Sequence, residues 1–166
     1  GAPLHGPDGL IYPGTCRPSE PPKEPMPDRP LRLDMARALS QAPDLSYEET
    51  GTSNPGHILI KNLDKTAGDV ALSRPGMAAA YHLAIVCDDA DQGITHVIRG
   101  EDLSAATAIH VLLQKLLNLP TPTYHHHRLI RDDQGKRLAK RDDARAISTY
   151  RMEGVTPAAI RAKLSA

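Results

Sequence analysis

The chain has 166 residues, enough for one ordinary domain, and 40% of them are hydrophobic while 24% are charged. That balance fits a soluble globular protein and argues against disorder throughout. The 20 basic and 20 acidic side chains cancel, and the absence of Phe and Trp speaks against a protein that stacks single-stranded nucleic acid on aromatic rings. Two cysteines cannot make a disulfide framework and no apolar run suits a membrane helix, so we expect a cytoplasmic protein without a membrane partner. The chain starts with Gly, and we expect it to begin part-way through something larger.

The first part of the chain predicts loop and short strands. Prolines are concentrated in residues 1–30, and because proline cannot donate to a helix or sheet ladder, we expect loop or extended chain there. Residues 31–41 are compatible with a strand or a helix. Residues 57–61 and 69–73 each predict a short strand, and neighbouring Gly and Pro residues are expected to end these strands.

A different pattern begins at residue 78. Residues 78–90 form an apolar segment that we expect to be buried, and the β-branched run 94–98 predicts a strand. Residues 104–118 carry apolar side chains on a broad face and predict a helix, and residues 123–130 predict the next strand. The order strand, helix, strand implies a right-handed crossover and a parallel α/β sheet.

Mixed charges mark the loop at residues 131–143. Alone, such a loop is usually solvated surface. The functional alternative is a mobile cationic loop that closes on the triphosphate of ATP, with Lys140 offsetting the charge that develops as pyrophosphate leaves. Two short helices follow, at about 144–153 and from Thr156 as cap, with Pro157 in its first turn.

One arginine stands at the end of the predicted strand 94–98. In an open α/β sheet, ligands bind beyond the carboxyl ends of the strands, and Arg99 lies at that end, within HVIRGEDL. Its planar fork can hold a carboxylate through two hydrogen bonds. A surface arginine at a strand end is the other interpretation, and the octapeptide alone does not separate the two.

Three segments together resemble a known family. AYHLAIVCDDADQGITHVIRG runs into HVIRGEDL, a helix follows, and then comes TYHHHRLIRDDQGKRLAKRDD. Over more than sixty residues, in this order, they resemble the glutamate branch of the class I aminoacyl-tRNA synthetases. The resemblance implies an α/β fold: the second half of a class I Rossmann-type catalytic domain, with part of a zinc-containing, acceptor-type insertion.

The resemblance assigns two residues to an L-glutamate substrate. Tyr81 matches the family tyrosine that contacts glutamate, and Arg99 matches the arginine that also binds it. The segment SRPGM, Ser73–Met77, departs from the Arg-x-Asp-Gly of the family before the tyrosine. The local turn there therefore stays open.

A second assignment concerns ATP, with Mg²⁺. RLAKR stands where the family has its KMSKS loop, and Lys140 matches the second lysine of that motif, which implies a catalytic, ATP-facing role. Arg137 replaces the first lysine of the motif and is followed by Leu138. Ala139 replaces the first serine, and Arg141 replaces the final serine. The cationic role survives these changes, while Ala139 lacks a hydroxyl for a phosphate hydrogen bond.

Within the glutamate branch, the details are most similar to the glutamyl-queuosine tRNA(Asp) synthetases. That group binds zinc through two closely spaced cysteines and a later Tyr-x-x-x-Cys pair, and IYPGTCR supplies this pair as Tyr12 and Cys16. The two earlier cysteines would precede Gly1. The resemblance thus implies one Zn²⁺ with a partial ligand set in this chain, and tRNA(Asp) carrying queuosine as the partner.

The resemblance also implies four segments. Residues 1–30 are a remnant of the zinc-binding insertion with a Pro-rich loop, and residues 31–77 are the remainder of that insertion with short strands. Residues 78–130 are the second half of the Rossmann-type domain. Residues 131–166 hold the KMSKS-like loop and C-terminal helices.

Other candidate sites are weaker. His125, His126 and His127 look like a metal cluster, but in a strand at most His125 and His127 share a face. Structural or nucleotide-adjacent histidines are the better interpretation. Asp88 and Asp89 are expected to end a buried segment and to bind nearby backbone.

Three functions stay open. By the resemblance, the complete protein activates glutamate with ATP and transfers it to the queuosine base of tRNA(Asp). The alternatives are a fragment of an ordinary glutamyl-tRNA synthetase, and an inactive truncated remnant or RNA-binding fragment. The family's HIGH-like motif lies N-terminal to everything present here, and since catalysis by positioning needs both halves of a site, we expect the 166-residue chain alone to be inactive.

Overall fold

The computed structural model describes residues 4–20, 29–51, 55–131, 134–135, 137–138 and 146–165. The chain divides into two compact units, residues 1–127 and residues 128–166. The larger unit is an α/β structure, which agrees with the predicted class. Among the described residues, no helix has the length and apolar character needed to cross a membrane.

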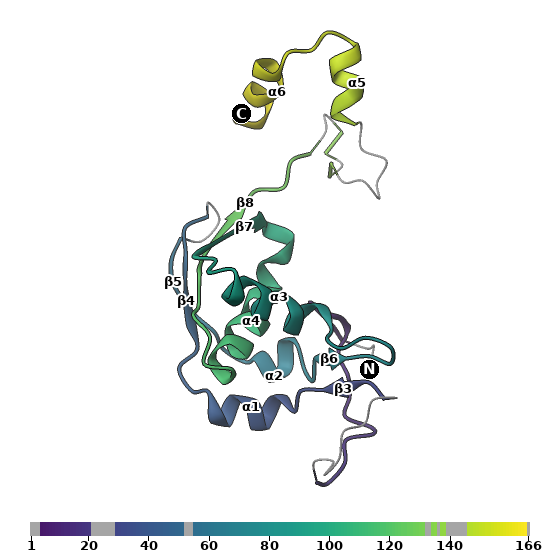
Figure 1. The fold of residues 1–166 in the computed structure, drawn as a ribbon, viewed down its shortest axis with the longest axis vertical. Coiled ribbons are helices and arrows are strands. Elements are labelled where there is room, and N and C mark those ends of the chain that lie inside the picture. The colour runs from purple at the N-terminus through teal and green to yellow at the C-terminus, as the bar shows by residue number, and fades with distance from the viewer. Residues whose placement is uncertain are drawn as a thin grey trace. The chain divides into compact units, whose positions relative to one another are not determined.

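A four-stranded mixed sheet organises the larger unit (Figure 1). Its strand order is β5 (Gly56–Leu59), β4 (Ser46–Glu49), β8 (Thr123–His127) and β7 (His96–Gly100). β8 runs parallel to both β7 and β4, whereas β5 is antiparallel to β4. The predicted strands and the predicted parallel pair are therefore confirmed, with β8 ending at His127 rather than at residue 130. β5 makes the sheet mixed instead of wholly parallel.

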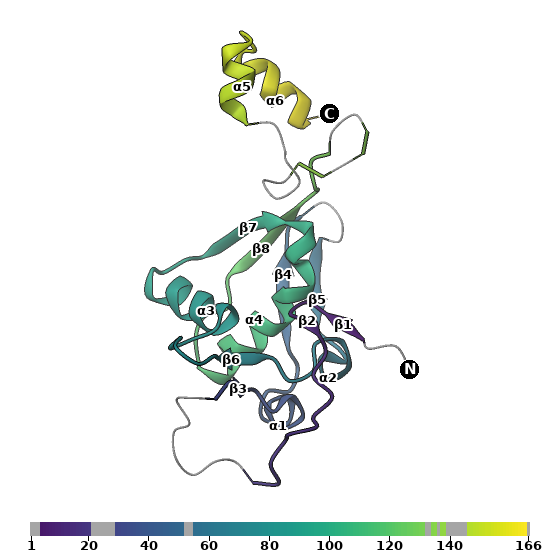
Figure 2. The ribbon, with the colours of Figure 1, turned by 90° about the vertical axis from the view of Figure 1, so that its right-hand side faces the viewer.

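Helix α4 (Ser104–Leu116) joins β7 to β8 and lies against one face of the sheet (Figure 2). A short 3-10 turn, η1 (Glu101–Leu103), precedes it. Ile109 and Leu112 on its apolar face are 0% exposed and stand at the centre of the core. The predicted helix is confirmed, and it ends before Asn118, which has a left-handed φ of 55°.

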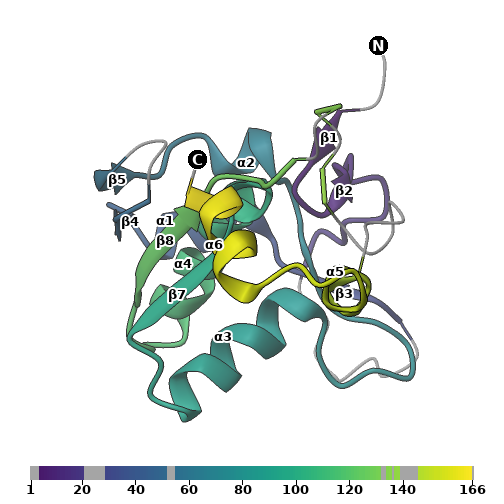
Figure 3. The same cartoon turned by 90° about the horizontal axis from the view of Figure 1, so that it is seen from above.

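The apolar segment that starts at residue 78 forms helix α3 (Tyr81–Asp91), which packs against α4 (Figure 3). Of its residues, His82 and Val86 are buried, so the expected burial holds for one stripe and not for the whole segment. Asp88 and Asp89 lie in its last turns, where their backbone carbonyls accept hydrogen bonds from the residues that end the helix.

The N-terminal part holds two small antiparallel ribbons. β1 (His5–Gly6) pairs with β2 (Gly9–Leu10) inside the predicted loop region, and β3 (Leu31–Arg32) pairs with β6 (Ala71–Ser73). Residues 31–41 contain both a strand and a helix, because the Asp34 carboxylate accepts the Arg37 N–H at 3.2 Å and begins α1 (Met35–Gln41). The remaining helix of this part is α2 (Leu63–Thr66).

Among its described residues, the smaller unit contains the helices α5 (Ile147–Met152) and α6 (Pro157–Ser165). As predicted, Thr156 caps α6: its Oγ1 accepts the Ala159 N–H at 3.2 Å. Before α5, the Leu138 N–H donates to the Ile130 carbonyl at 2.9 Å.

Candidate functional site

Arg99 lies on β7 next to its carboxyl end and holds its guanidinium against three neutral acceptors. Nε donates to Nε2 of His126 at 3.1 Å, and Nη2 donates to Oγ1 of Thr107 at 2.6 Å. Nη1 lies 3.3 Å from Nδ1 of His110. Within the described ranges, no carboxylate forms an ion pair with Arg99. Of the five N–H groups of a guanidinium, these contacts use three and leave two for a ligand.

A buried Glu–His pair holds His126 from its other side. The side chains of His126, on β8, and Glu49, at the end of β4, are 4% and 6% exposed. Nδ1 of His126 lies 2.5 Å from Oε2 of Glu49, while Oε1 accepts the backbone N–H groups of His126 at 3.0 Å and Gly51 at 2.7 Å. Burial alone would raise the pKa of Glu49, but these hydrogen bonds outweigh it and lower the pKa below its ordinary 4.5. Glu49 is therefore a carboxylate at neutral pH.

The two partners of His126 show which tautomer the ring has. Because arginine can only donate, Nε2 of His126 accepts, and the ring proton sits on Nδ1, from which it is donated to Glu49. The Thr107 hydroxyl lies 3.2 Å from the same Nε2 and can donate to it while accepting from Arg99. His126 is thus a neutral ring between a carboxylate and a cation.

A second arm leads from Arg99 to the N-terminal ribbon. Nε2 of His110 lies 3.0 Å from Nδ1 of His82, and Nε2 of His82 lies 3.8 Å from Oδ1 of Asp8, in the turn between β1 and β2. The same directional argument puts the proton of each ring on Nε2. Burial, and then the charge of Arg99, lowers the pKa of His110 from 6.5 to about 3. Burial also lowers the pKa of His82, so both rings are neutral at pH 7.

Two tyrosines flank this cluster. Tyr81, the first residue of α3, is 56% exposed and lies edge-on to the ring of His110, with centroids 6.0 Å apart. Tyr124 is buried, stacks on His126 at 6.1 Å and lies 5.3 Å from the Arg99 guanidinium carbon. Tyr81 is therefore open to a ligand, whereas Tyr124 belongs to the support of the cluster.

The structure brings together both of the residues that the sequence resemblance assigns to glutamate. Tyr81 and Arg99 both contact His110, so they lie on one cluster although they come from different elements. The turn at SRPGM is closed by a hydrogen bond from the Met77 N–H to the Arg74 carbonyl at 2.9 Å.

The cationic loop is described in part. Arg137, partly buried, forms an isolated antiparallel bridge with Arg131, and Leu138 is 42% exposed. Both residues belong to the smaller unit. Lys140, Ala139 and Arg141 lie outside the described residues.

Sequence reasoning did not single out Glu49, Thr107, His110 or His82 as parts of this site. It treated the three histidines of β8 together, and the structure separates them: His126 is buried, while His127 on the opposite face is exposed. As expected from strand alternation, His126 points away from the face that His125 and His127 share. Alternation beside the buried Tyr124 is the local signal that could have identified His126 as an inward residue.

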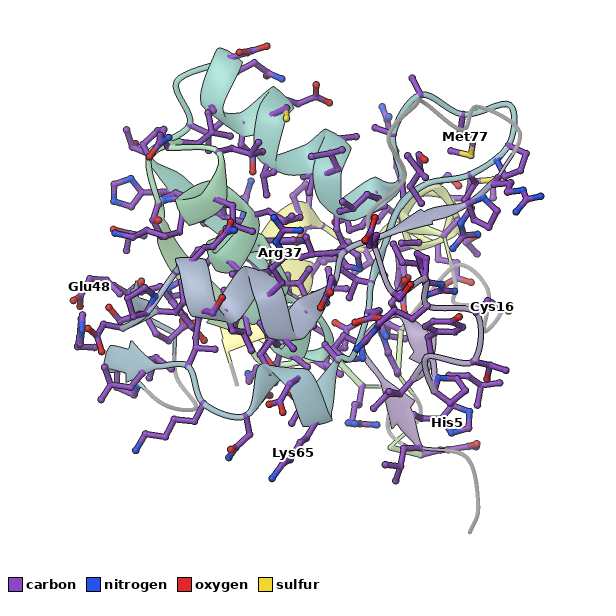
Figure 4. All side chains as sticks on the ribbon, turned by 90° about the horizontal axis from the view of Figure 1, so that it is seen from below. His5, Cys16, Arg37, Glu48, Lys65 and Met77 are labelled. Atoms are coloured by element: carbon purple, nitrogen blue, oxygen red, sulfur yellow. The ribbon has the colours of Figure 1, made fainter. Side chains whose placement is uncertain are left out.

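Tyr12 and Cys16 are neighbours in the structure. The Cys16 N–H donates to the Tyr12 hydroxyl at 2.6 Å, and the Arg32 guanidinium covers the Tyr12 ring at 4.8 Å. Cys16 is exposed at the periphery (Figure 4). No group of three or more His, Cys, Asp or Glu side chains among the described residues could hold a metal ion. Since zinc takes four ligands, this pair supplies two of them at most.

Comparisons with known proteins identify the class. Residues 48–165 match the catalytic-domain model of the class I tRNA synthetases for glutamate and glutamine. The chain belongs to this family of ligases, as the sequence segments predicted. The matched range includes most of the four-stranded sheet, Arg99 with its hydrogen-bond partners, and the smaller unit up to residue 165.

Individual relatives with similar sequences carry more specific names than the family does. The chain is 55% identical over 165 residues to the glutamyl-Q tRNA(Asp) synthetase of Rhodobacter capsulatus, covering 97% of this chain and 58% of the relative. It is 36% identical to the enzyme of the same name from a Neisseria meningitidis strain, covering 92% of this chain and 49% of the relative. A solved glutamate tRNA ligase from Elizabethkingia meningosepticum is 31% identical, with a TM-score of 0.46, covering 69% of this chain and 19% of the ligase. The chain thus spans about half the length of the curated relatives it matches.

Proposed function

We propose that the protein containing this chain activates glutamate with ATP and transfers it to the queuosine base of tRNA(Asp). Activation joins a glutamate carboxylate to the α-phosphate of ATP, giving glutamyl-adenylate and releasing pyrophosphate. The names of the similar relatives and 55% identity to one of them support this choice within the family.

One observation carries the proposal: Arg99 is a partly buried cation whose described partners are all neutral. Asp89 feels the charge of Arg99 but forms no ion pair with it among the described contacts. A partly buried cation without a carboxylate in direct contact favours an anionic ligand, and the two remaining N–H groups match the two oxygens of a carboxylate. The exposed ring of Tyr81 stands at the same cluster. We therefore assign glutamate to Arg99 and Tyr81.

The other roles follow from the sequence alone. Lys140, in the KMSKS-like loop of Arg137, Leu138, Ala139 and Arg141, would offset the charge on the phosphates of Mg²⁺–ATP as pyrophosphate leaves. Tyr12 and Cys16 would supply two ligands to a Zn²⁺ whose other ligands come from outside this chain. Zinc there would hold a structural part and would not act on the reacting atoms.

The test uses a chimera in which this chain replaces the segment it matches in the Rhodobacter capsulatus relative. Glutamate-dependent ATP–pyrophosphate exchange gives the KM for each substrate. Arg99→Ala should raise the KM for glutamate about 100-fold, because charge-assisted hydrogen bonds are lost, and change the KM for ATP less than about threefold. Arg37→Ala, at an exposed arginine of α1, is the matched control and should change neither. Equal effects of Arg99→Ala on both substrates would contradict the assignment.

The acceptor is tested separately. The chimera should attach glutamate to tRNA(Asp) that carries queuosine and not to tRNA(Asp) that lacks it. Glutamate on the 3′ end of tRNA(Glu) would favour the ordinary glutamyl-tRNA synthetase instead. The 166-residue chain by itself should show no exchange, since the chain spans 58% of its relative.

A further inference from the structure

We infer that Glu49, His126 and Thr107 act together as positioning residues for Arg99, and we call these three residues the Arg99 brace. The inference rests on the proposed function, because it concerns the residue assigned to glutamate. It adds what holds that residue in place and why the hold leaves its charge available.

The Arg99 brace has a single hydrogen-bond direction. Glu49 accepts from Nδ1 of His126, and Nε2 of His126 accepts from Nε of Arg99. Thr107, which is 0% exposed, accepts from Nη2 of Arg99 and can donate to the same Nε2. A ring with its proton on Nε2 would set two donors against each other at the guanidinium. The position of Arg99 therefore depends on the tautomer that Glu49 selects.

Glu49 is itself held by hydrogen bonds. Its Oε1 is fixed by the backbone N–H groups of Gly51 and His126, so the carboxylate cannot rotate without leaving two buried donors unpaired. A Cβ on Gly51 would lie 2.3 Å from the His126 carbonyl oxygen and 2.7 Å from Oε1 of Glu49, which shows how closely the two strand ends approach. The brace is thus anchored on the backbone of β4 and β8.

The placement of a ring between Glu49 and Arg99 has a chemical consequence. A carboxylate paired directly with Arg99 would occupy the N–H groups and the charge that a substrate carboxylate needs. With His126 between them, Glu49 orients the guanidinium through a neutral acceptor and leaves it without a direct counter-ion. The arrangement positions the cation and keeps it free for an anionic ligand.

The first test measures the tautomer of His126 by ¹⁵N NMR of the 166-residue chain. The parent should show a protonated Nδ1 and an unprotonated Nε2. In Glu49→Gln, Oε1 can still accept both backbone N–H groups, but the amide N–H faces Nδ1, so the proton should move to Nε2 and the Arg99 Nε signal should shift. Glu48→Gln, at the exposed neighbouring carboxylate, should leave both signals unchanged. A protonated Nε2 in the parent, or an unchanged tautomer in Glu49→Gln, overturns the inference.

The second test measures KM values for exchange in the chimera. Glu49→Gln and Thr107→Val should each raise the KM for glutamate about tenfold, the value of one lost hydrogen bond to a charged group, with little effect on the KM for ATP. Thr107→Ser keeps the hydroxyl and should retain the parent values. Equal losses for glutamate and ATP, or a loss in Thr107→Ser as large as that in Thr107→Val, would indicate a merely structural role.

The two proposals fail in different ways. If Arg99→Ala leaves the KM for glutamate unchanged, the glutamate assignment is wrong, while the tautomer measurement still decides whether Glu49 sets the hydrogen-bond direction at Arg99. If Arg99→Ala has its expected effect and Glu49→Gln has none on the KM or on the tautomer, the Arg99 brace is wrong and the glutamate assignment stands.

Discussion

Two consecutive residues of β4 form the same kind of contact in opposite surroundings. Glu48 lies 2.6 Å from Nδ1 of His57, and Glu49 lies 2.5 Å from Nδ1 of His126. Because successive side chains of a strand point to opposite faces, the first pair is more than half exposed (Glu48 is labelled in Figure 4), while the second is less than a tenth exposed. Distance therefore does not distinguish the two pairs, but burial does.

Burial changes what each pair contributes. Water screens the exposed pair and can replace either partner, so such pairs contribute about 0–1 kcal/mol to stability. The buried Glu49 has no water to replace its three donors, and its pKa is lowered by them despite its burial. The buried pair is also continued by Arg99 beyond the ring, whereas the exposed pair ends at His57 in the contacts of the described residues. The buried pair is therefore the one that can fix the orientation of the Arg99 guanidinium.

The largest expected effect comes from removing the buried carboxylate. Glu49→Ala leaves two backbone N–H groups and the Nδ1–H of His126 unpaired, and should lower the free energy of unfolding by about 3–5 kcal/mol. Glu48→Ala should lower it by less than about 0.5 kcal/mol. Urea unfolding of the 166-residue chain measures both, and similar values for the two variants would contradict the comparison.

The next largest effect is expected from a substitution that fills the space beside the buried Glu49–His126 pair. Gly51→Ala adds a Cβ that would lie 2.3 Å from a backbone oxygen, so the strand ends must separate, at a cost of about 1–3 kcal/mol. Gly93→Ala is the control: nothing lies within 4 Å of its Cβ, but its φ of 66° is strained for alanine and costs about 1 kcal/mol. Gly51→Ala alone should also shift the His126 ring signals. Unshifted His126 signals in a folded Gly51→Ala protein would show that the brace tolerates movement.

A smaller effect is expected from His110, which makes the free energy of unfolding depend on pH. The pKa of His110 is about 3 in the folded chain against 6.5 without the fold, so the unfolded chain binds the proton first as the pH falls. Above pH 6.5 the neutral His110 does not lower the free energy of unfolding. As the pH falls from 6.5 to about 3, the free energy of unfolding decreases by up to about 1.4 kcal/mol per pH unit. His110→Gln should reduce this slope in urea unfolding between about pH 7 and 4.5. His96→Gln, at an exposed histidine of β7, should keep it.

Local patterns were sufficient for much of the fold. The apolar face of residues 104–118 predicts α4, and the β-branched run before Arg99 predicts β7, because each pattern is contained in its own segment. β4 was missed, since its sequence SYEE is polar and its one buried side chain is a glutamate. Such a strand is recognised from its neighbours in the sheet and not from its own composition.

The residues of the site also fall into those that a local sequence pattern predicts and those that it does not. Arg99 could be predicted from its place near a strand end and from the family resemblance. Glu49 could not, because it meets His126 across 77 positions and Thr107 and His110 reach Arg99 from the following helix. The charge that Glu49 carries and the tautomer that it selects are properties of the folded contact, which no local pattern encodes.

The smallest expected effect concerns the exposed pair, and it sharpens the comparison most. Glu48 and His57 are direct cross-strand neighbours in the β4–β5 register, so their side chains start from adjacent positions on one face of the sheet. A double-mutant cycle with Glu48→Gln and His57→Gln should still give a coupling of about 0.3 kcal/mol, which about 0.5 M salt weakens further because ions reach the exposed Glu48 carboxylate. The same cycle with Glu49→Gln and His126→Gln should give a coupling of about 2 kcal/mol that salt does not change, because no ions reach a buried pair. If salt weakened both couplings in proportion, the buried pair would be open to solvent, and Glu49 could not hold His126 in one tautomer for Arg99.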